Sequence, residues 1–132
     1  MSILIYELED LLIELPDTPI SFGHCGFHHY QDVMLLMTRS ANLYGDFAWW
    51  HILPIDYIAR GFVFAKSVGV MDRLMWGTDF PHVNPGDVIE KFRKIPAYTV
   101  QNNLEPAITE EDMNSFFGEN AERFVKSRKS SS

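Results

Sequence analysis

The stretch Arg73-Leu-Met-Trp-Gly-Thr-Asp-Phe-Pro-His82 contains a strand, a turn and two polar side chains in immediate succession. Its apolar run, Leu74–Trp76, predicts a short buried strand. The glycine and proline that follow predict a turn directly after that strand. Asp79 and His82 lie in this turn, beyond the carboxyl end of the strand. Because parallel α/β folds bind their ligands at this end, the stretch predicts both an α/β fold and the place of its chemistry.

Two earlier segments repeat this order. Strands are predicted at residues 20–22 and 43–48, and helices at residues 3–15, 30–38 and 54–67. After the third strand we predict a helix from Pro85 that Pro96 closes, a loop at 97–108, a helix behind Thr109-Glu-Glu-Asp112, and a last helix at 120–126. The Thr109 segment has the pattern of a capping box. Strands that alternate with helices predict a parallel sheet with right-handed crossovers.

Such a sheet is normally covered by helices on both faces. Three strands with helices on one side would leave the other face bare, and Phe22, Tyr44, Phe47 and Trp76 would then be exposed. The sequence therefore predicts that the sheet continues in another chain or belongs to a larger barrel. Self-association, or binding to a missing part of the barrel, is the expected consequence.

Composition limits the class of protein. The 132 residues amount to one domain, predicted over 1–126, with a disordered tail at 127–132. A net charge of -7 argues against binding to nucleic acid and against an electrostatically held membrane surface. No apolar run approaches the roughly 20 residues of a membrane span. The single Cys25 and the absence of a basic leader at the start predict a reducing, cytoplasmic location.

Every histidine follows a predicted strand, so all of them are expected on one rim of the sheet together with Asp46 and Asp79. The five are His24, His28, His29, His51 and His82. Imidazoles and carboxylates gathered in this way suit zinc or manganese, or general acid–base catalysis. The alternative is that loops are simply polar, and that Asp79 only caps a turn.

Other residues near this rim have two interpretations each. Trp49 and Trp50 are candidates for the wall of a substrate pocket, with packing in the core as the alternative. Ser21 and Cys25 are candidate nucleophiles only because His24 is near, and a lone cysteine is more often a small packing residue.

The quoted stretch, together with Glu119-Asn-Ala-Glu-Arg-Phe124, resembles the carboxyl end of the amidohydrolase superfamily. The branch it resembles is the amidohydrolase-related one, which includes aminocarboxymuconate-semialdehyde decarboxylase. Phe22-Gly-His-Cys-Gly26 is similar to that branch's sixth-strand segment, and Asn42-Leu-Tyr-Gly-Asp46 to its seventh strand. The resemblance covers about residues 1–126.

This resemblance implies a metal-bearing (β/α)8 TIM barrel of which the chain supplies strands six to eight. It implies that Asp79 is a metal ligand that also activates water or orients substrate, and that His24 lies beside the metal and polarises substrate. His28, His82, Trp49 and Trp50 are the expected substrate contacts.

Two departures from the family pattern stand out. The family's seventh strand often bears a serine two residues after its aspartate, and here Ala48 stands at that position. The family's first-strand His-x-His pair and fifth-strand histidine have no counterpart. A full barrel needs about 250 residues. The expectation is therefore an incomplete barrel: a truncated product, one set of exons, or half of a split enzyme.

The predicted function is that of a metal-dependent hydrolase or decarboxylase acting on a C–N or C–C bond of a small, carboxylate-type substrate. The alternative is a non-catalytic α/β interaction module that binds itself or a partner through an uncovered sheet face.

Overall fold

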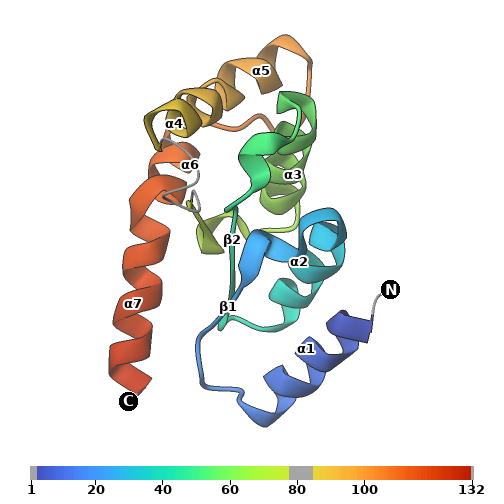
Figure 1. The fold of residues 1–132 in the computed structure, drawn as a ribbon, viewed down its shortest axis with the longest axis vertical. Helices are drawn as coiled ribbons and strands as arrows, with labels where there is room; N and C mark the ends of the chain where they lie inside the picture. The colour runs from blue at the N-terminus through green and yellow to red at the C-terminus, as the bar shows by residue number, and fades with distance from the viewer. Residues whose placement is uncertain (1–2, 78–84, 132) are drawn as a thin grey trace.

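The computed structural model describes residues 3–77 and 85–131 and contains three parallel strands in the order β1-β2-β3 (Figure 1). They are β1 (Ile20–Phe22), β2 (Leu43–Asp46) and β3 (Leu74–Met75). Helix α2 (Tyr30–Arg39) connects the first pair, and α3 (Ile55–Ser67) connects the second. The predicted parallel α/β architecture is confirmed, although β2 and β3 end earlier than the sequence suggested.

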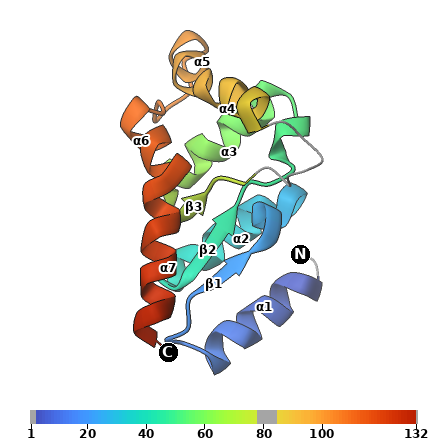
Figure 2. The same ribbon diagram turned by 60° about the vertical axis from the view of Figure 1, so that its left-hand side comes forward.

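One layer of helices packs on the sheet through apolar stripes. Helix α2 buries Val33, Met34 and Met37, and α3 buries Ile58 and Phe62. This spacing places one apolar face toward the strands. Helix α1 (Ile3–Glu14) lies beside α2 in the same layer (Figure 2).

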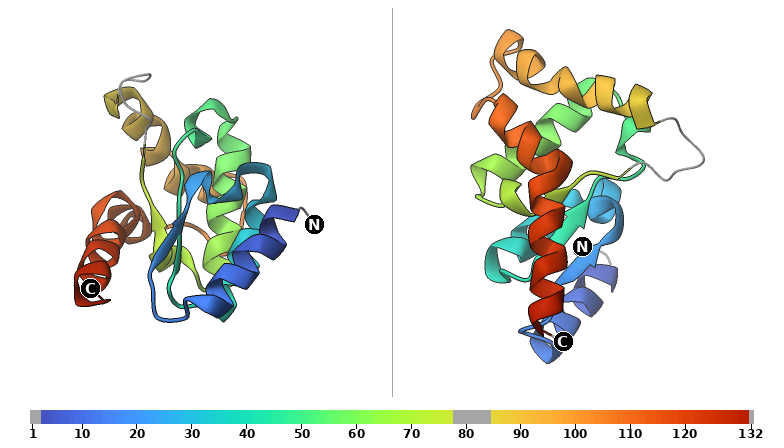
Figure 3. Two further views of the ribbon diagram at one scale, coloured as in Figure 1. Left: turned by 60° about the horizontal axis from the view of Figure 1, so that its bottom comes forward. Right: turned by 90° about the vertical axis from the view of Figure 1, so that its left-hand side faces the viewer.

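On the opposite face of the sheet, α7 (Asn120–Ser131) packs on β3 and on Tyr44 of β2, and it lies across from α1 and α3 (Figure 3). Tyr44 is only 7% exposed, and its ring lies 4.9 Å from that of Phe124 on α7. Phe47 is fully buried. The prediction that both would be exposed is wrong, because successive strand residues face opposite layers and each layer is present. Phe22 and Trp76 are half-buried.

The remaining elements are short and mostly follow β3. They are η1 (Gly23–His29), η2 (Trp50–Ile52), η3 (Met71–Arg73), α4 (Pro85–Arg93), α5 (Ile95–Gln101), α6 (Glu110–Asn114) and the π-helical turn η4 (Ser115–Glu119). None of the helices within the described ranges is long and apolar enough to cross a membrane.

Two predicted boundaries are wrong after β3. Pro96 does not close a helix: it sits in the first turn of α5, where its missing N–H costs nothing, and α5 occupies part of the predicted loop. Helix α7 continues to Ser131 instead of ending at Lys126. The disorder expected at residues 127–132 stays a prediction. The capping box is confirmed, since the Thr109 side chain accepts from the Asp112 N–H and the Asp112 carboxylate accepts from the Thr109 N–H.

The outer edge of β3 is closed by the chain's own last helical segments. The buried Asn120 side chain donates to the carbonyl oxygens of Met71 (3.1 Å) and Leu74 (2.8 Å). The Trp76 N–H donates to the Phe116 carbonyl at 3.1 Å. Among the described residues β1 pairs only with β2, so the two edges of the sheet differ.

Candidate functional site

The rim at the carboxyl ends of β1 and β2 brings together η1 and the segment 47–52. These segments carry four of the five histidines. Asp79 and His82, which the sequence placed at the centre of the site, lie outside the described residues. The structure therefore bears on His24, His28, Trp49 and Trp50 among the predicted site residues.

The backbone of η1 has an unusual conformation directly after β1. His24 (φ 57°), Cys25 (φ 48°), Gly26 (φ 74°) and Phe27 (φ 50°) all have positive φ. Residues other than glycine avoid this region because the Cβ atom crowds the backbone. Such strain persists only when surrounding contacts over-determine it, and it is concentrated at functional sites.

Four hydrogen bonds supply those contacts and form what we call the His24 clasp, made of His24, Asp46, Ala48 and Trp50. Asp46 Oδ1 accepts from the backbone N–H groups of His24 (3.0 Å) and Ala48 (3.2 Å). His24 Nδ1 lies 2.9 Å from the Ala48 carbonyl oxygen, and Trp50 Nε1 donates to the His24 carbonyl at 2.7 Å. The loops after β1 and β2 are thereby joined at one residue.

The clasp determines how the His24 imidazole can act. A carbonyl oxygen only accepts, so His24 Nδ1 carries the hydrogen of that bond, and in the neutral ring Nε2 is left with a lone pair. The side chain is 42% exposed, and Nε2 makes no hydrogen bond to the part of the chain that the structure describes. Nε2 is thus available to accept a proton or a hydrogen bond, or to bind a cation.

Trp50 belongs to the clasp through its hydrogen bond to the His24 carbonyl, and its side chain does not reach solvent. Its ring is fully buried and stacks on Phe47, with centroids 4.0 Å apart and an interplanar angle of 7°. Close approach to α3 depends on Gly61, where an added Cβ would lie 2.7 Å from the Trp50 ring. Trp50 therefore takes the packing role that was the alternative to a substrate wall.

Trp49 and His28 are the predicted substrate contacts that do reach solvent. Trp49 is 40% exposed, and its ring lies nearly parallel to that of His51, with centroids 6.1 Å apart. The exposed His28 ring lies 4.1 Å from that of His29. Both remain candidates for contact with a ligand on this rim.

Cys25 is fully buried and packs over β2, where a Cβ on Gly45 would come within 2.7 Å of its Sγ. Burial, and next the charge of Asp46, raise the pKa of the Cys25 thiol. Because the thiolate is the nucleophilic form, Cys25 takes the packing role and we drop it as a nucleophile.

Lys91 on α4 is a residue of this region that the sequence analysis missed. Its ammonium group donates to the carbonyl oxygens of His51 (2.7 Å) and Leu53 (2.5 Å), and burial lowers its pKa. These bonds hold η2 against α4. No sequence signal marks them, because the acceptors are backbone carbonyls.

The rim carries imidazole and carboxylate groups, the donor types that divalent metals bind. Within residues 3–77 and 85–131, no three His, Cys, Asp or Glu side chains lie close enough together to hold a metal. However, the hydrogen bond from Nδ1–H of His24 to a backbone carbonyl is the arrangement that orients histidines at metal centres. Asp79 stays the predicted ligand.

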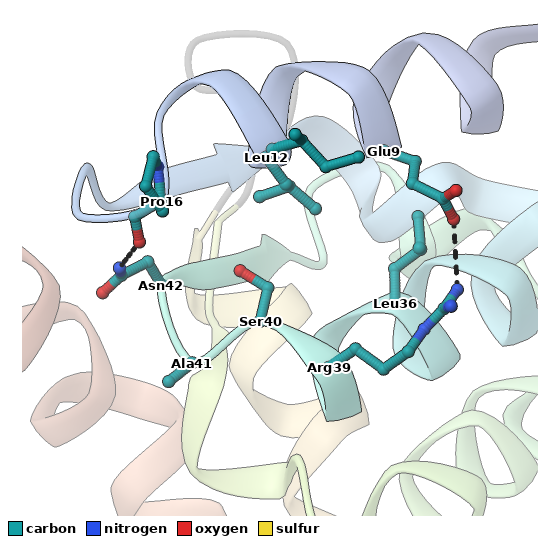
Figure 4. A pocket seen from close by; sticks show the side chains of 9 residues that line it. Glu9, Leu12, Pro16, Leu36, Arg39, Ser40, Ala41 and Asn42 are labelled. Atoms are coloured by element: carbon teal, nitrogen blue, oxygen red, sulfur yellow. Dashed lines mark hydrogen bonds and ion pairs between the residues drawn. The ribbon is translucent and has the colours of Figure 1, made fainter.

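A pocket of about 380 Å³ lies at the opposite, amino end of the sheet, between α1 and α2 (Figure 4). Two of the residues that line it, Glu9 and Arg39, form an ion pair of 3.1 Å. Nine residues line it: Glu9, Leu12, Ile13, Pro16, Leu36, Arg39, Ser40, Ala41 and Asn42. Since the amino end of a parallel α/β unit serves stability, we place the candidate site on the rim.

Comparison with known proteins supports the fold and a family. Residues 2–126 match the family model described as amidohydrolase. No curated protein matches the chain. An uncharacterised TIM-barrel protein from Bordetella bronchiseptica is 22% identical, with a TM-score of 0.72, over 93% of this chain and 39% of that chain. At this identity the likeness shows the fold, and the chain spans only part of the barrel's length.

Proposed function

Because this chain belongs to the amidohydrolase family, we propose that it contributes the rim of a metal-dependent hydrolase or decarboxylase site. Its three strand–helix units correspond in this proposal to strands six to eight of a (β/α)8 barrel. The parallel order of β1, β2 and β3 and the likeness to part of a TIM barrel support that assignment. The motif resemblance favours the branch that includes aminocarboxymuconate-semialdehyde decarboxylase.

The observation that carries the proposal is the presentation of His24 on the rim. When neutral, its Nε2 accepts a hydrogen bond or a proton from water or substrate. When protonated, it donates to a substrate oxygen, while the Ala48 carbonyl at 2.9 Å and the Asp46 carboxylate, 3.9 Å from Nδ1, face the positive ring. One group can therefore polarise a substrate and transfer a proton.

Asp79 is the proposed ligand of zinc or manganese and the proposed proton acceptor, with His24 beside the metal. A bound divalent cation would supply Lewis acidity and lower the pKa of water. Trp49, His28 and His82 are proposed to contact a small carboxylate-type substrate at its C–N or C–C bond. We also propose a cytoplasmic location.

Turnover and metal content of Asp79→Asn test this function in the protein that carries the complete site. Asparagine keeps the shape but loses the charge and the proton-accepting ability, so turnover should fall about 10²- to 10⁴-fold. Circular dichroism should stay unchanged. His24→Ala should also lower turnover, but with the metal retained.

Asp17→Asn is the matched control for Asp79→Asn, because this exposed carboxylate lies in the turn before β1, at the opposite end of the sheet. Its turnover should equal that of the unsubstituted protein. An Asp79→Asn protein that turns over as fast as this control would rule out the metal-site function.

The second candidate is an interaction module, and a specific surface favours it. Leu11, Ile13 and Leu15 around α1 are exposed, and so is Leu35 on α2. Ser21 on the neighbouring edge strand β1 is also exposed. Because α7 packs on the β2 and β3 part of the sheet face first considered and leaves Ser21 of β1 exposed, a second copy or a missing part of the barrel would dock along α1 and β1. Activity that appears only when a missing barrel part is added favours the enzyme, whereas a stable self-assembled chain without activity favours the module.

A further inference from the structure

Asp46 is the acceptor on which the His24 clasp depends. Its Oδ1 accepts the N–H of His24 from the loop after β1 and the N–H of Ala48 from the loop after β2. The same two residues are joined again by the bond from His24 Nδ1 to the Ala48 carbonyl. One carboxylate oxygen thus positions both the residue whose imidazole donates this bond and the residue whose carbonyl accepts it.

We propose that Asp46 is a positioning residue that holds His24 in its Nδ1–H tautomer, with Nε2 as the lone-pair nitrogen presented on the rim. Hydrogen bonds from backbone N–H groups to an ionised carboxylate are strong ones. Without them, His24 would lose a contact that offsets its positive φ. The imidazole would then move away from the Ala48 carbonyl.

The charge of Asp46 favours the same His24 tautomer as the hydrogen-bond geometry does. Oδ1 lies 3.9 Å from His24 Nδ1, on the side of the ring that carries the hydrogen. A proton on Nδ1 is therefore favoured over a proton on Nε2, which points away from the clasp. The tautomer is a property of the fold. The inference rests on the proposed function only where Nε2 is said to accept a proton or a hydrogen bond from water or substrate.

Nitrogen NMR of the ¹⁵N-histidine-labelled chain tests the proposal, with the His24 signals assigned by their loss in His24→Gln. We expect a protonated Nδ1 and a bare Nε2 in the unsubstituted chain. Asp46→Asn should keep this pattern, because the amide oxygen still accepts both N–H groups. Asp46→Ala should lose it in most molecules in favour of the Nε2–H form, which free histidine prefers.

Asp17→Ala is the matched control, since it removes an exposed carboxylate at the other end of the sheet and should leave the pattern unchanged. An unsubstituted chain with Nε2–H, a folded Asp46→Ala that keeps Nδ1–H, or a folded Asp46→Asn that loses it would overturn the proposal. If Asp46→Ala does not fold, Asp46→Ser replaces it, because the shorter hydroxyl cannot reach both N–H groups.

The positioning role and the proposed function fail in different ways. If His24 takes the Nδ1–H form and loses it in Asp46→Ala, while Asp79→Asn keeps its turnover, the positioning role is sustained and the metal-site function is removed. If His24 takes the Nε2–H form in a protein whose turnover depends on Asp79, the positioning role is removed and the metal-site function is sustained.

Discussion

Gly45 lies in β2 directly beneath Cys25, and replacing it with alanine should destabilise the protein. An added Cβ would lie 2.7 Å from Cys25 Sγ and 3.1 Å from Cys25 Cβ. Favourable separations between such atoms are about 3.5–4.0 Å, so the two groups must move apart by roughly 1 Å. Cys25 is fully buried and its backbone already has φ 48°, so it has little room to yield.

The cost follows from this overlap. Overpacking a core typically costs about 1–3 kcal/mol. Because one of the two contacts involves a Cβ that cannot rotate away, we expect about 2 kcal/mol for Gly45→Ala. That corresponds to a fall in Tm of roughly 8 °C for a domain of this size. Urea unfolding followed by circular dichroism measures the loss.

Gly118→Ala is the matched control, because a Cβ there would meet nothing within 4 Å. Its free energy of unfolding should change little or rise by up to about 1 kcal/mol, as alanine favours a helix. Cys25→Ala combined with Gly45→Ala should cost less than the sum of the single changes by at least about 0.5 kcal/mol. A Gly45→Ala chain as stable as Gly118→Ala, or strict additivity, would refute the reasoning.

Three further outcomes are expected. Burial raises the pKa of Asp112, but hydrogen bonds from Lys66 and Thr109 lower it more, so the net pKa is below the ordinary value. The stability that this provides is present above about pH 4 and lost as the pH falls further, and Asp112→Asn should flatten that part of a urea stability profile. Asn120→Ala removes the side-chain donor of the Leu74 carbonyl and leaves the Met71 carbonyl with the Leu74 N–H alone, so it should cost about 1–3 kcal/mol, measured by the same unfolding. Ile13, 71% exposed, should support self-association, so Ile13→Glu should shift sedimentation toward monomer, and a chain that is monomeric without the change would contradict this.

Local pattern was enough to predict the strands, their parallel order and the capping box at Thr109. An apolar run bounded by glycine and proline predicts a strand, and apolar residues at helical spacing predict a helix. Both patterns can be recognised from sequence because they depend only on near neighbours in the chain. The same reasoning placed His24 after β1 and on the rim. The positions of Asp79 and His82 as site residues rest on sequence alone.

Tertiary structure decided what covers the sheet and how the rim is built. Tyr44 is buried because Phe124 of α7, from the far end of the chain, packs against it. No sequence pattern near Tyr44 predicts that contact. Trp50 is buried because Gly61 leaves room for its ring. The orientation of His24 depends on a backbone oxygen at Ala48. Every residue carries such an oxygen, so only the folded chain determines which one faces a given side chain.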